Sequence, residues 1–341
     1  MSVIALAGCR GAPGVTTSAL ALLLAWPLEP GRKMILAECD PDGGAVLHGL
    51  LQGTLSDRYG LRNLSIAARK NEFGDAFWRQ LIDLSSEDGQ QESPRDRLLL
   101  PGITDPAEAA GLGPVWKPLA VTFRGIAADY DHDVLIDLGR SGAVGPSAVL
   151  AERADAVFVV VRNTLRCLQA AQAGVRALEE RVGDVGLLMI DEGPYAAGEV
   201  QRVLQVPVLA TLPYAPKDAR VLSDGADQPR HFTKSALMKA ARTASSLLVQ
   251  RAALRRSPPG TAHPGRRRGD ACCAVGLCTL IPPWRRRPET RGRPRPVRQP
   301  APLRVRPRVP GRSAQRRLRS PSTTGSPGTS RPRSPGSARN F

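Results

Sequence analysis

Short apolar runs alternate with stretches of helical periodicity over the first 250 residues of this 341-residue chain. Clusters of Gly, Pro and Asp bound the apolar runs, as is typical of short buried strands. Strands buried on both faces and separated by helices predict an α/β fold with a doubly wound, mostly parallel sheet and helices on both faces. The predicted strands are 3–7, 33–38, 98–102, 133–139, 156–162, 186–190 and 206–212. The predicted helices are 61–69, 73–84, 165–181, 199–204 and 235–254, together with 18–25 near the start of the chain.

The segment between the first strand and the first helix has the layout of a phosphate-binding loop. Residues 8–17 read Gly-Cys-Arg-Gly-Ala-Pro-Gly-Val-Thr-Thr. Backbone N–H groups of such a turn and the N-terminus of the following helix together form an anion site. The usual pattern ends in Gly-Lys-Ser/Thr. Gly14 and Thr16 fit this pattern, but Val15 stands where the lysine belongs.

Two acidic residues lie at the carboxyl ends of predicted strands: Asp40 comes after 33–38, and Asp137 is near the end of 133–139. Ligands of doubly wound sheets bind at the carboxyl ends of the strands, so both acids are expected near the opening loop. Asp40 also lies in Asp-Pro-Asp-Gly-Gly, which is ordinary turn chemistry, and Asp137 could merely cap the next segment. We favour a metal-side role for both.

These features together resemble the MinD/ParA group of P-loop ATPases over residues 1–250. The nearest members are the actinobacterial MinD-like proteins related to the TadZ/CpaE localisation factors. The motifs that carry the resemblance are Pro-Gly-Val-Thr-Thr at 13–17, Glu-Cys-Asp-Pro at 38–41, Gly-Pro-Tyr at 193–195, Leu-Pro-Tyr at 212–214 and Leu-Ser-Asp-Gly at 222–225.

The family loop reads Gly-Lys-Gly-Gly-x-Gly-Lys-Thr, and this chain departs from it at four positions, Cys9, Arg10, Ala12 and Val15. The resemblance implies that Arg10 replaces the lysine that reaches the partner subunit's nucleotide. It implies catalytic roles for Asp40 and Arg10, and Mg²⁺ binding by Thr16, Asp40 and Asp137. The implied nucleotide-binding residues are Gly11, Ala12, Pro13, Gly14, Val15, Thr16, Thr17 and Pro213, with Tyr195 beside Pro213 at the base.

The resemblance implies ATP with Mg²⁺ as cofactors, and GTP stays open because Asp191 and Glu192 occupy the place of the family's adenine-reading Asn. It also implies a nucleotide-dependent homodimer that recruits a secretion or pilus ATPase or membrane machinery. We interpret the chain as a degenerate ATPase acting as a positioning or regulatory factor in septum placement, partition or pilus and secretion assembly. One alternative is an active ATP-hydrolysing dimeric switch in which Arg10 compensates for the missing lysine.

The basic charge of the chain lies in its last part. The formal net charge is +17, yet residues 251–341 contain 23 Arg and only 2 acidic residues. We therefore divide the chain into a nucleotide-binding domain at 1–254 and an Arg/Pro-rich tail at 255–341, expected to be disordered. A second alternative function is a DNA-binding partition protein that uses this tail. We also hypothesise that the tail is a frameshift product, which an intact mass ending at Phe341 would contradict.

We expect a cytoplasmic protein, with peripheral association at the inner face of the membrane as an open option. The apolar run 20–28 is too short to span a bilayer. The final helix 235–254 could be a basic membrane anchor, but a docked closing helix is favoured. Cys9 and Cys39 are expected to pack rather than bind metal.

Overall fold

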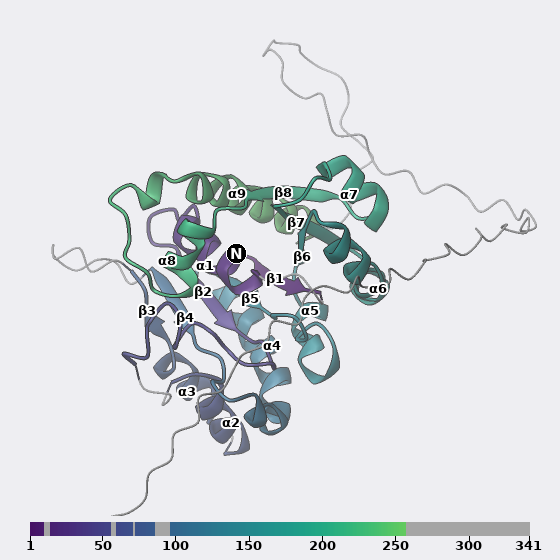
Figure 1. The fold of residues 1–341 in the computed structure, drawn as a ribbon. Helices are drawn as coiled ribbons and strands as arrows, with labels where there is room; N and C mark the ends of the chain where they lie inside the picture. Colours follow the sequence, from purple (N-terminus) through teal and green to yellow (C-terminus); the bar gives the residue numbers. More distant parts are fainter. Residues whose placement is uncertain (10–13, 56–58, 71, 86–95, 257–341) are drawn as a thin grey trace, which may run out of the picture. The chain divides into compact units, whose positions relative to one another are not determined.

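The computed structural model describes residues 1–9, 14–55, 59–70, 72–85 and 96–256, and the account below concerns these residues. They form an eight-stranded sheet with the order β3-β4-β2-β5-β1-β6-β7-β8 (Figure 1). Every pairing is parallel except that of β3 with β4. The strands are β1 (Val3–Gly8), β2 (Lys33–Glu38), β3 (Ile82–Asp83), β4 (Arg97–Leu100), β5 (His132–Asp137), β6 (Ala156–Arg162), β7 (Val185–Asp191) and β8 (Val208–Pro213).

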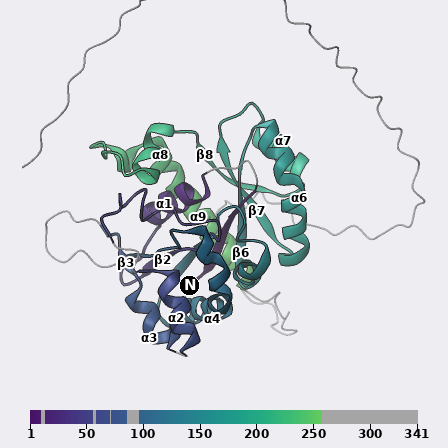
Figure 2. The same cartoon turned by 60° about the horizontal axis from the view of Figure 1, so that its bottom comes forward.

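Helices cover both faces of this sheet (Figures 1 and 2). One face carries α1 (Val15–Ala25), α8 (Pro216–Ser223) and α9 (Ala236–Arg256). The other face carries α2 (Leu61–Arg69), α3 (Phe73–Arg79), α4 (Gly113–Asp129), α5 (Val149–Glu152), α6 (Leu165–Val182) and α7 (Ala197–Leu204). Short 3₁₀ turns lie at Pro106–Leu112, Gly145–Ala148 and Phe232–Lys234. The predicted doubly wound α/β fold is confirmed.

Alternate residues of the central strand β1 pack into different hydrophobic cores. Val3 and Ala5 belong to the core under α2–α7, whereas Ile4 and Leu6 belong to the core under α1, α8 and α9. Successive side chains of a strand point to opposite faces, so a strand covered on both faces is apolar throughout. This burial explains why β1 and β5–β7 appear in the sequence as short continuous apolar runs.

Helix α1 is apolar nearly all round because it lies between the sheet and two other helices. It packs on β1, β2 and β5 on one side and on α8 and α9 on the other. A helix that is buried all round has no polar face. The apolar run 20–28 is thus core, and no helix in the described ranges is long and apolar enough to cross a membrane.

The last helix, α9, is docked, as predicted. Its buried residues include Leu237, Ala241 and Leu248. At its C-terminal end Arg251 and Arg255 both pair with Asp184, at 2.6 and 3.1 Å. The basic residues at this end of the helix are therefore used to hold α9 to the sheet. The predicted boundary at 254/255 stays a prediction, and the tail from 257 lies outside the described residues.

Several elements differ from the sequence-based expectation, including the short helix α5, which was not predicted. The predicted helix 73–84 was wrong at its end, because α3 stops at Arg79 and Ile82–Asp83 pairs antiparallel with β4. Helix α4 was not predicted, although Trp116, Leu119 and Phe123 give it an apolar face. Two prolines in its first turns obscured that periodicity. Helix α8, which opens on a proline, was also missed. The predicted surface loop at 85–95 falls almost wholly outside the described residues.

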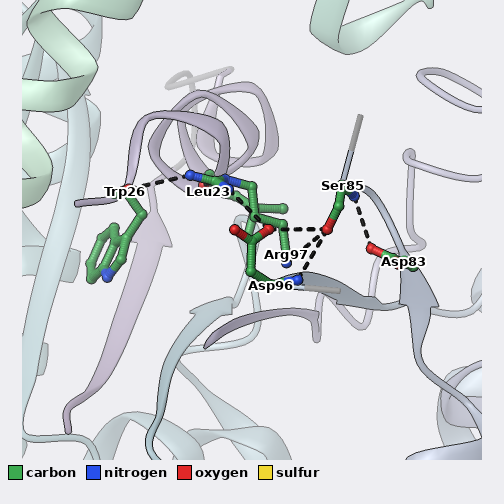
Figure 3. Close-up of polar contacts among 6 residues, drawn as sticks. All are labelled: Leu23, Trp26, Asp83, Ser85, Asp96 and Arg97. Atoms are coloured by element: carbon green, nitrogen blue, oxygen red, sulfur yellow. Dashed lines mark hydrogen bonds and ion pairs between the residues drawn. The ribbon is translucent and has the colours of Figure 1, made fainter. Parts of the chain in front are cut away.

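A side chain from β4 caps the C-terminal end of α1 (Figure 3). Helix α1 has no basic residue in its own last turn. Instead, Arg97 donates from Nε to the Leu23 carbonyl at 3.1 Å and from Nη2 to the Trp26 carbonyl at 3.4 Å. Asp96 holds the guanidinium at 3.0 Å, and the Ser85 hydroxyl donates to Asp96. The guanidinium adds a charged donor to carbonyls that also accept from the Trp26 and Leu28 N–H groups, and a cation at this end suits the helix dipole.

Removing this cap tests its importance. Arg97→Ala removes the charged donor from the Leu23 and Trp26 carbonyls, which keep one backbone N–H donor each, and we expect the free energy of unfolding to fall by about 1–3 kcal/mol. The control is Arg32→Ala, whose surface pair with Glu29 is exposed and should contribute less than about 0.5 kcal/mol. Urea unfolding of both variants measures the difference. Equal effects of the two substitutions would contradict the capping role.

Candidate functional site

The opening loop leaves β1 between β5 and β6 and enters α1 at Val15. Gly14 is the last loop residue described before the helix, and its φ is +116°. A Cβ at this position would lie 3.0 Å from Cδ1 of Ile190 on β7. Both the backbone conformation and the close neighbour therefore favour glycine here. The predicted site residues Arg10, Gly11, Ala12 and Pro13 lie outside the described residues.

Asp137 is a fully buried carboxyl at the carboxyl end of β5. Its Oδ1 accepts a hydrogen bond from the Gly139 N–H at 2.9 Å, whereas Oδ2 has no partner among the described residues. Burial raises the pKa of Asp137 to about 7, while the Thr16 hydroxyl that faces it favours the charged form. Glu38 and Asp40 nearby add to the rise. A buried oxygen without a partner is costly, so this arrangement suits a cation.

Asp40 lies next to this carboxyl, on the segment after β2. Its Oδ1 accepts from the Asp42 N–H at 2.9 Å. Its other oxygen, Oδ2, packs so closely on Gly139 that a Cβ there would lie 1.7 Å from it, and Gly139 has a φ of +55°. Burial raises the pKa of Asp40, and the Arg140 N–H and guanidinium oppose that rise. Glycine at 139 is thus required for Asp40 to approach the end of β5.

Glu38, the other acid of the Glu-x-Asp pair, has a different role. It is buried, and its Oε1 accepts from the N–H groups of Ala45 and Val46 at 2.6 and 3.1 Å. Its Oε2 accepts from the Gly102 N–H at 3.0 Å. Glu38 therefore ties the segment after β2 to the loop after β4, and Asp40 alone of the pair lines the cavity described next. Sequence reasoning missed this structural role.

A cavity of about 160 Å³ is lined by five of the predicted residues, but not by Pro213 or by the fully buried Asp137. We call it the phosphate cavity. Its lining residues are Gly14, Val15, Thr16, Thr17, Asp40, Gly139 and Arg140. The Val15 side chain is only 4% exposed and belongs to the core under α1. The position where the usual loop carries a lysine is therefore filled by a packed apolar group.

A second, mostly apolar cavity of about 90 Å³ adjoins the first and shares Gly14 and Thr17 with it. We call it the base cavity. Pro213 lines it, together with Arg162 and Tyr214. The Arg162 guanidinium lies over the Tyr214 ring, 5.5 Å from its centroid, and pairs with Glu192 at 2.6 Å. Tyr195, expected beside Pro213, does not line this cavity and packs against the core under α2–α7.

Asn163, immediately after β6, is a buried residue that the sequence did not single out. Its Nδ2 lies 2.7 Å from Oδ1 of Asp191 and 2.8 Å from the Tyr195 carbonyl. Its Oδ1 accepts from the N–H groups of Glu192 and Gly193 at 2.8 and 2.5 Å. Asn163 thus fixes the loop after β7, beside the base cavity. The one signal in the sequence was an Asn that directly follows the apolar run of a buried strand.

The cysteines pack, as expected. Cys39 is fully buried, and the Cys9 sulfur lies 3.9 Å from the Ala171 carbonyl of α6. Burial raises the pKa of the Cys9 thiol to about 11, so it is not a thiolate at neutral pH. In the part of the chain that the structure describes, no three His, Cys, Asp or Glu side chains are grouped to hold a metal ion by themselves.

No protein-family model matches the sequence, and no curated protein matches it. Solved structures do match the fold. A ParA family ATPase from Chlorobium tepidum TLS is similar at a TM-score of 0.56 and 15% identity, over 72% of this chain and 97% of that one. The MinD of Pyrococcus horikoshii OT3, complexed with Mg-ADP, gives 0.52 and 17%, over 75% and 99%. The MinC:MinD complex of Aquifex aeolicus gives 0.53 and 16%, over 76% and 98%.

These likenesses bear out the predicted fold. At such low identity they establish the arrangement of strands and helices, which is that of MinD and ParA ATPases. They cover almost the whole of each solved chain, so the likeness extends over the whole of that fold.

The buried Asp137 carboxyl generates a pH-dependent prediction. Its pKa of about 7 in the folded protein lies above the ordinary value of 3.8. The folded state therefore holds the proton more tightly, and the ligand-free protein loses stability as the pH rises from about 4 to about 7. We expect Asp137→Asn to raise the free energy of unfolding at about pH 8 by about 1–3 kcal/mol, and by less near pH 5.

Urea unfolding without divalent ions at the two pH values measures this effect. The matched control is Asp133→Asn on the same strand, because both Asp133 oxygens accept hydrogen bonds, from Ser2 and Trp26. That control should be destabilised. An Asp137→Asn protein that is less stable than wild type at pH 8 would show that the carboxyl is well satisfied without a ligand.

Proposed function

We propose that this chain binds a nucleoside triphosphate with Mg²⁺ at the carboxyl edge of the sheet and acts as a MinD/ParA-like positioning or regulatory factor. One observation carries the proposal. Thr16, Asp40 and Asp137 come from three separate segments and meet at the start of α1, where one oxygen of Asp137 has no partner among the described residues. A hydroxyl and two carboxylates beside a helix N-terminus suit Mg²⁺ and phosphate together.

The two adjoining cavities suggest which end of the nucleotide lies where. The triphosphate occupies the phosphate cavity, beside Thr16 and Thr17, and the base occupies the base cavity, beside Pro213 and Tyr214. Because the cavities share Gly14 and Thr17, one molecule can extend across both. ATP is the proposed nucleotide, and GTP is not excluded, because Asp191 and Glu192 follow β7 where the family reads adenine with Asn.

The residues present fit Mg²⁺. Thr16 would hold the ion through its hydroxyl, Oδ2 of Asp137 would face its positive charge, and Asp40 would orient it or its bound water. Mg²⁺ binds one or two carboxylates and completes its shell with water and phosphate oxygens, so no cluster of three acidic or imidazole side chains is needed. When bound, the ion neutralises charge on the phosphates and orients them. The similar MinD of Pyrococcus horikoshii was solved with Mg-ADP.

The packed Val15 side chain supports a degenerate ATPase rather than an efficient one. Phosphoryl transfer depends on positioning and charge stabilisation. Replacing an ammonium by an apolar group removes a charge-assisted hydrogen bond of about 1.5–3 kcal/mol, and more in the transition state. The nucleotide is therefore bound and slowly hydrolysed, and its presence controls the protein's partners. Arg10, the candidate catalytic cation of the active-switch alternative, lies outside the described residues.

Within this proposal the chain acts as a cytoplasmic, nucleotide-dependent homodimer, nearest to the actinobacterial MinD-like proteins. Its partner would be a secretion or pilus ATPase or membrane machinery, with peripheral association at the inner face. Among the similar structures, the MinD of Aquifex aeolicus was solved in complex with MinC. DNA is a proposed partner only through the basic tail at 255–341, and nearly all of that tail lies outside the described residues.

Nucleotide titration of site variants tests the metal-side residues. We expect Thr16→Ala and Asp40→Asn each to weaken Mg²⁺-dependent binding of fluorescent ATP by about 10–100-fold, since each removes an oxygen ligand or its support. Binding measured with EDTA should change much less. Thr243→Ala, an exposed threonine of α9, is the control. Equal ATP affinity with and without Mg²⁺ in the wild type would contradict the metal site, and no binding at millimolar ATP would refute the function.

Val15→Lys tests why hydrolysis is slow. A lysine can lay its stem along the core under α1 and direct its ammonium into the phosphate cavity that Val15 lines. We expect tighter ATP binding, by about tenfold, and faster phosphate release. Val15→Met, of similar length without charge, is the control for altered packing, and circular dichroism verifies folding. Turnover that is already fast in the wild type and unchanged by Val15→Lys would favour the active-switch alternative.

A further inference from the structure

The proposed phosphate cavity has an unbalanced set of charges. Asp40 lines it, and Asp137 and Glu38 lie close behind. Val15 contributes no charge at the position of the usual lysine. A nucleoside triphosphate would bring several further negative charges to carboxylates only a few ångströms away, which is unfavourable without cations besides Mg²⁺. Among the described residues that line the cavity, Arg140 is the one with a positive charge.

Arg140 is exposed, and its guanidinium makes no ion pair with any described residue. Its charge favours the charged form of Asp40. By contrast, Arg162 at the base cavity is already committed to Glu192 and to the Tyr214 ring. Arg140 is thus the cation of the two that is available to a ligand.

The backbone that carries Arg140 is fixed on both sides. The Gly8 N–H donates to the Gly139 carbonyl at 2.7 Å, which ties the turn to the end of β1. The Gly142 N–H donates to the Leu138 carbonyl at 2.8 Å. The Ser141 hydroxyl donates to Asp42 at 2.6 Å, which ties the turn to the segment after β2. Because the backbone at Arg140 is already held in place, its long side chain can contact a ligand in the cavity with little loss of backbone entropy.

We propose that the Arg140 guanidinium binds the nucleotide phosphates and supplies, from the turn after β5, the positive charge that position 15 lacks. This inference rests on the proposed nucleotide binding. A guanidinium presents paired N–H donors that match phosphate oxygens, so it suits this task without occupying the lysine's place. Because Arg140 and Asp40 are in electrostatic contact, phosphate binding also links the turn after β5 to the segment after β2.

A simpler role for Arg140 is that of a surface counterion to Asp40. The two roles differ in what they predict with and without Mg²⁺. A counterion to Asp40 acts through the metal side of the site, so its loss changes ATP binding with Mg²⁺ and leaves binding in EDTA unchanged. A phosphate-binding cation affects ATP in both conditions and adenosine in neither.

The experiment compares binding of adenosine, AMP, ADP and ATP, with Mg²⁺ and with EDTA, to wild type, Arg140→Ala and Arg140→Lys by calorimetry. We expect Arg140→Ala to weaken ATP binding by about 10–50-fold, which corresponds to losing one charge-assisted contact, and adenosine binding by less than about twofold. Arg140→Lys should fall between. Arg124→Ala, an exposed arginine of α4 that lines a different cavity, is the matched control and should bind like wild type.

A double-mutant cycle with Val15→Lys adds a second readout. The ammonium introduced by Val15→Lys supplies the same charge. We therefore expect Arg140→Ala to weaken ATP binding much less in the Val15→Lys protein than in wild type, so the two effects do not add. ATP binding by Arg140→Ala equal to that of wild type overturns this inference and leaves nucleotide binding intact. Failure of wild type to bind any of the four ligands overturns the proposed function and this inference with it.

Discussion

The buried Asp137 carboxyl is the constraint on which the rest of the site depends. It ends a strand that pairs with β1 and with β2, and it is fully buried with one oxygen unpartnered among the described residues. Such a group is expensive in a folded protein unless a ligand compensates it. Thr16 and Asp40 approach the same carboxyl from α1 and from the segment after β2. Gly139 must lack a side chain for Asp40 to be there. A cation-binding role gives all of these features one physical reason.

The acidic residues of the site and position 15 of the opening loop differ in how far they follow the pattern that the resemblance implies. The acidic residues keep the positions that the resemblance to MinD and ParA proteins implies. At position 15 the side chain belongs to the hydrophobic core, because Val15 packs under α1. An apolar residue there strengthens the contact between helix and sheet, but it offers a ligand no positive charge. Arg140, rooted in a turn braced by Ser141 and Asp42, is the described group placed to restore it.

The sequence predicted the central strands because strands buried on both faces appear as apolar runs bounded by turn residues. Asp40, Asp137 and Thr16 followed from the same rule, since parallel strands end at one edge. The roles of Glu38 and Asn163 could not be predicted. Each depends on backbone N–H groups that distant segments bring to it, such as Gly102 for Glu38. The Arg162–Tyr214 contact likewise joins β6 to the end of β8, and nothing local marks it. Helix α4 was hidden by prolines that its first turns tolerate.

Hydrogen–deuterium exchange of the full chain, with Mg²⁺ alone and with Mg²⁺ and ATP, tests the central claim most directly. The account predicts slower exchange of backbone amides in three separate segments when ATP is added. These segments are 14–18 at the start of α1, 139–142 after β5 and 213–216 after β8. Protection in all three together would place one ligand across the phosphate and base cavities. Unchanged exchange in these segments at saturating ATP would contradict the existence of a nucleotide site at this edge of the sheet.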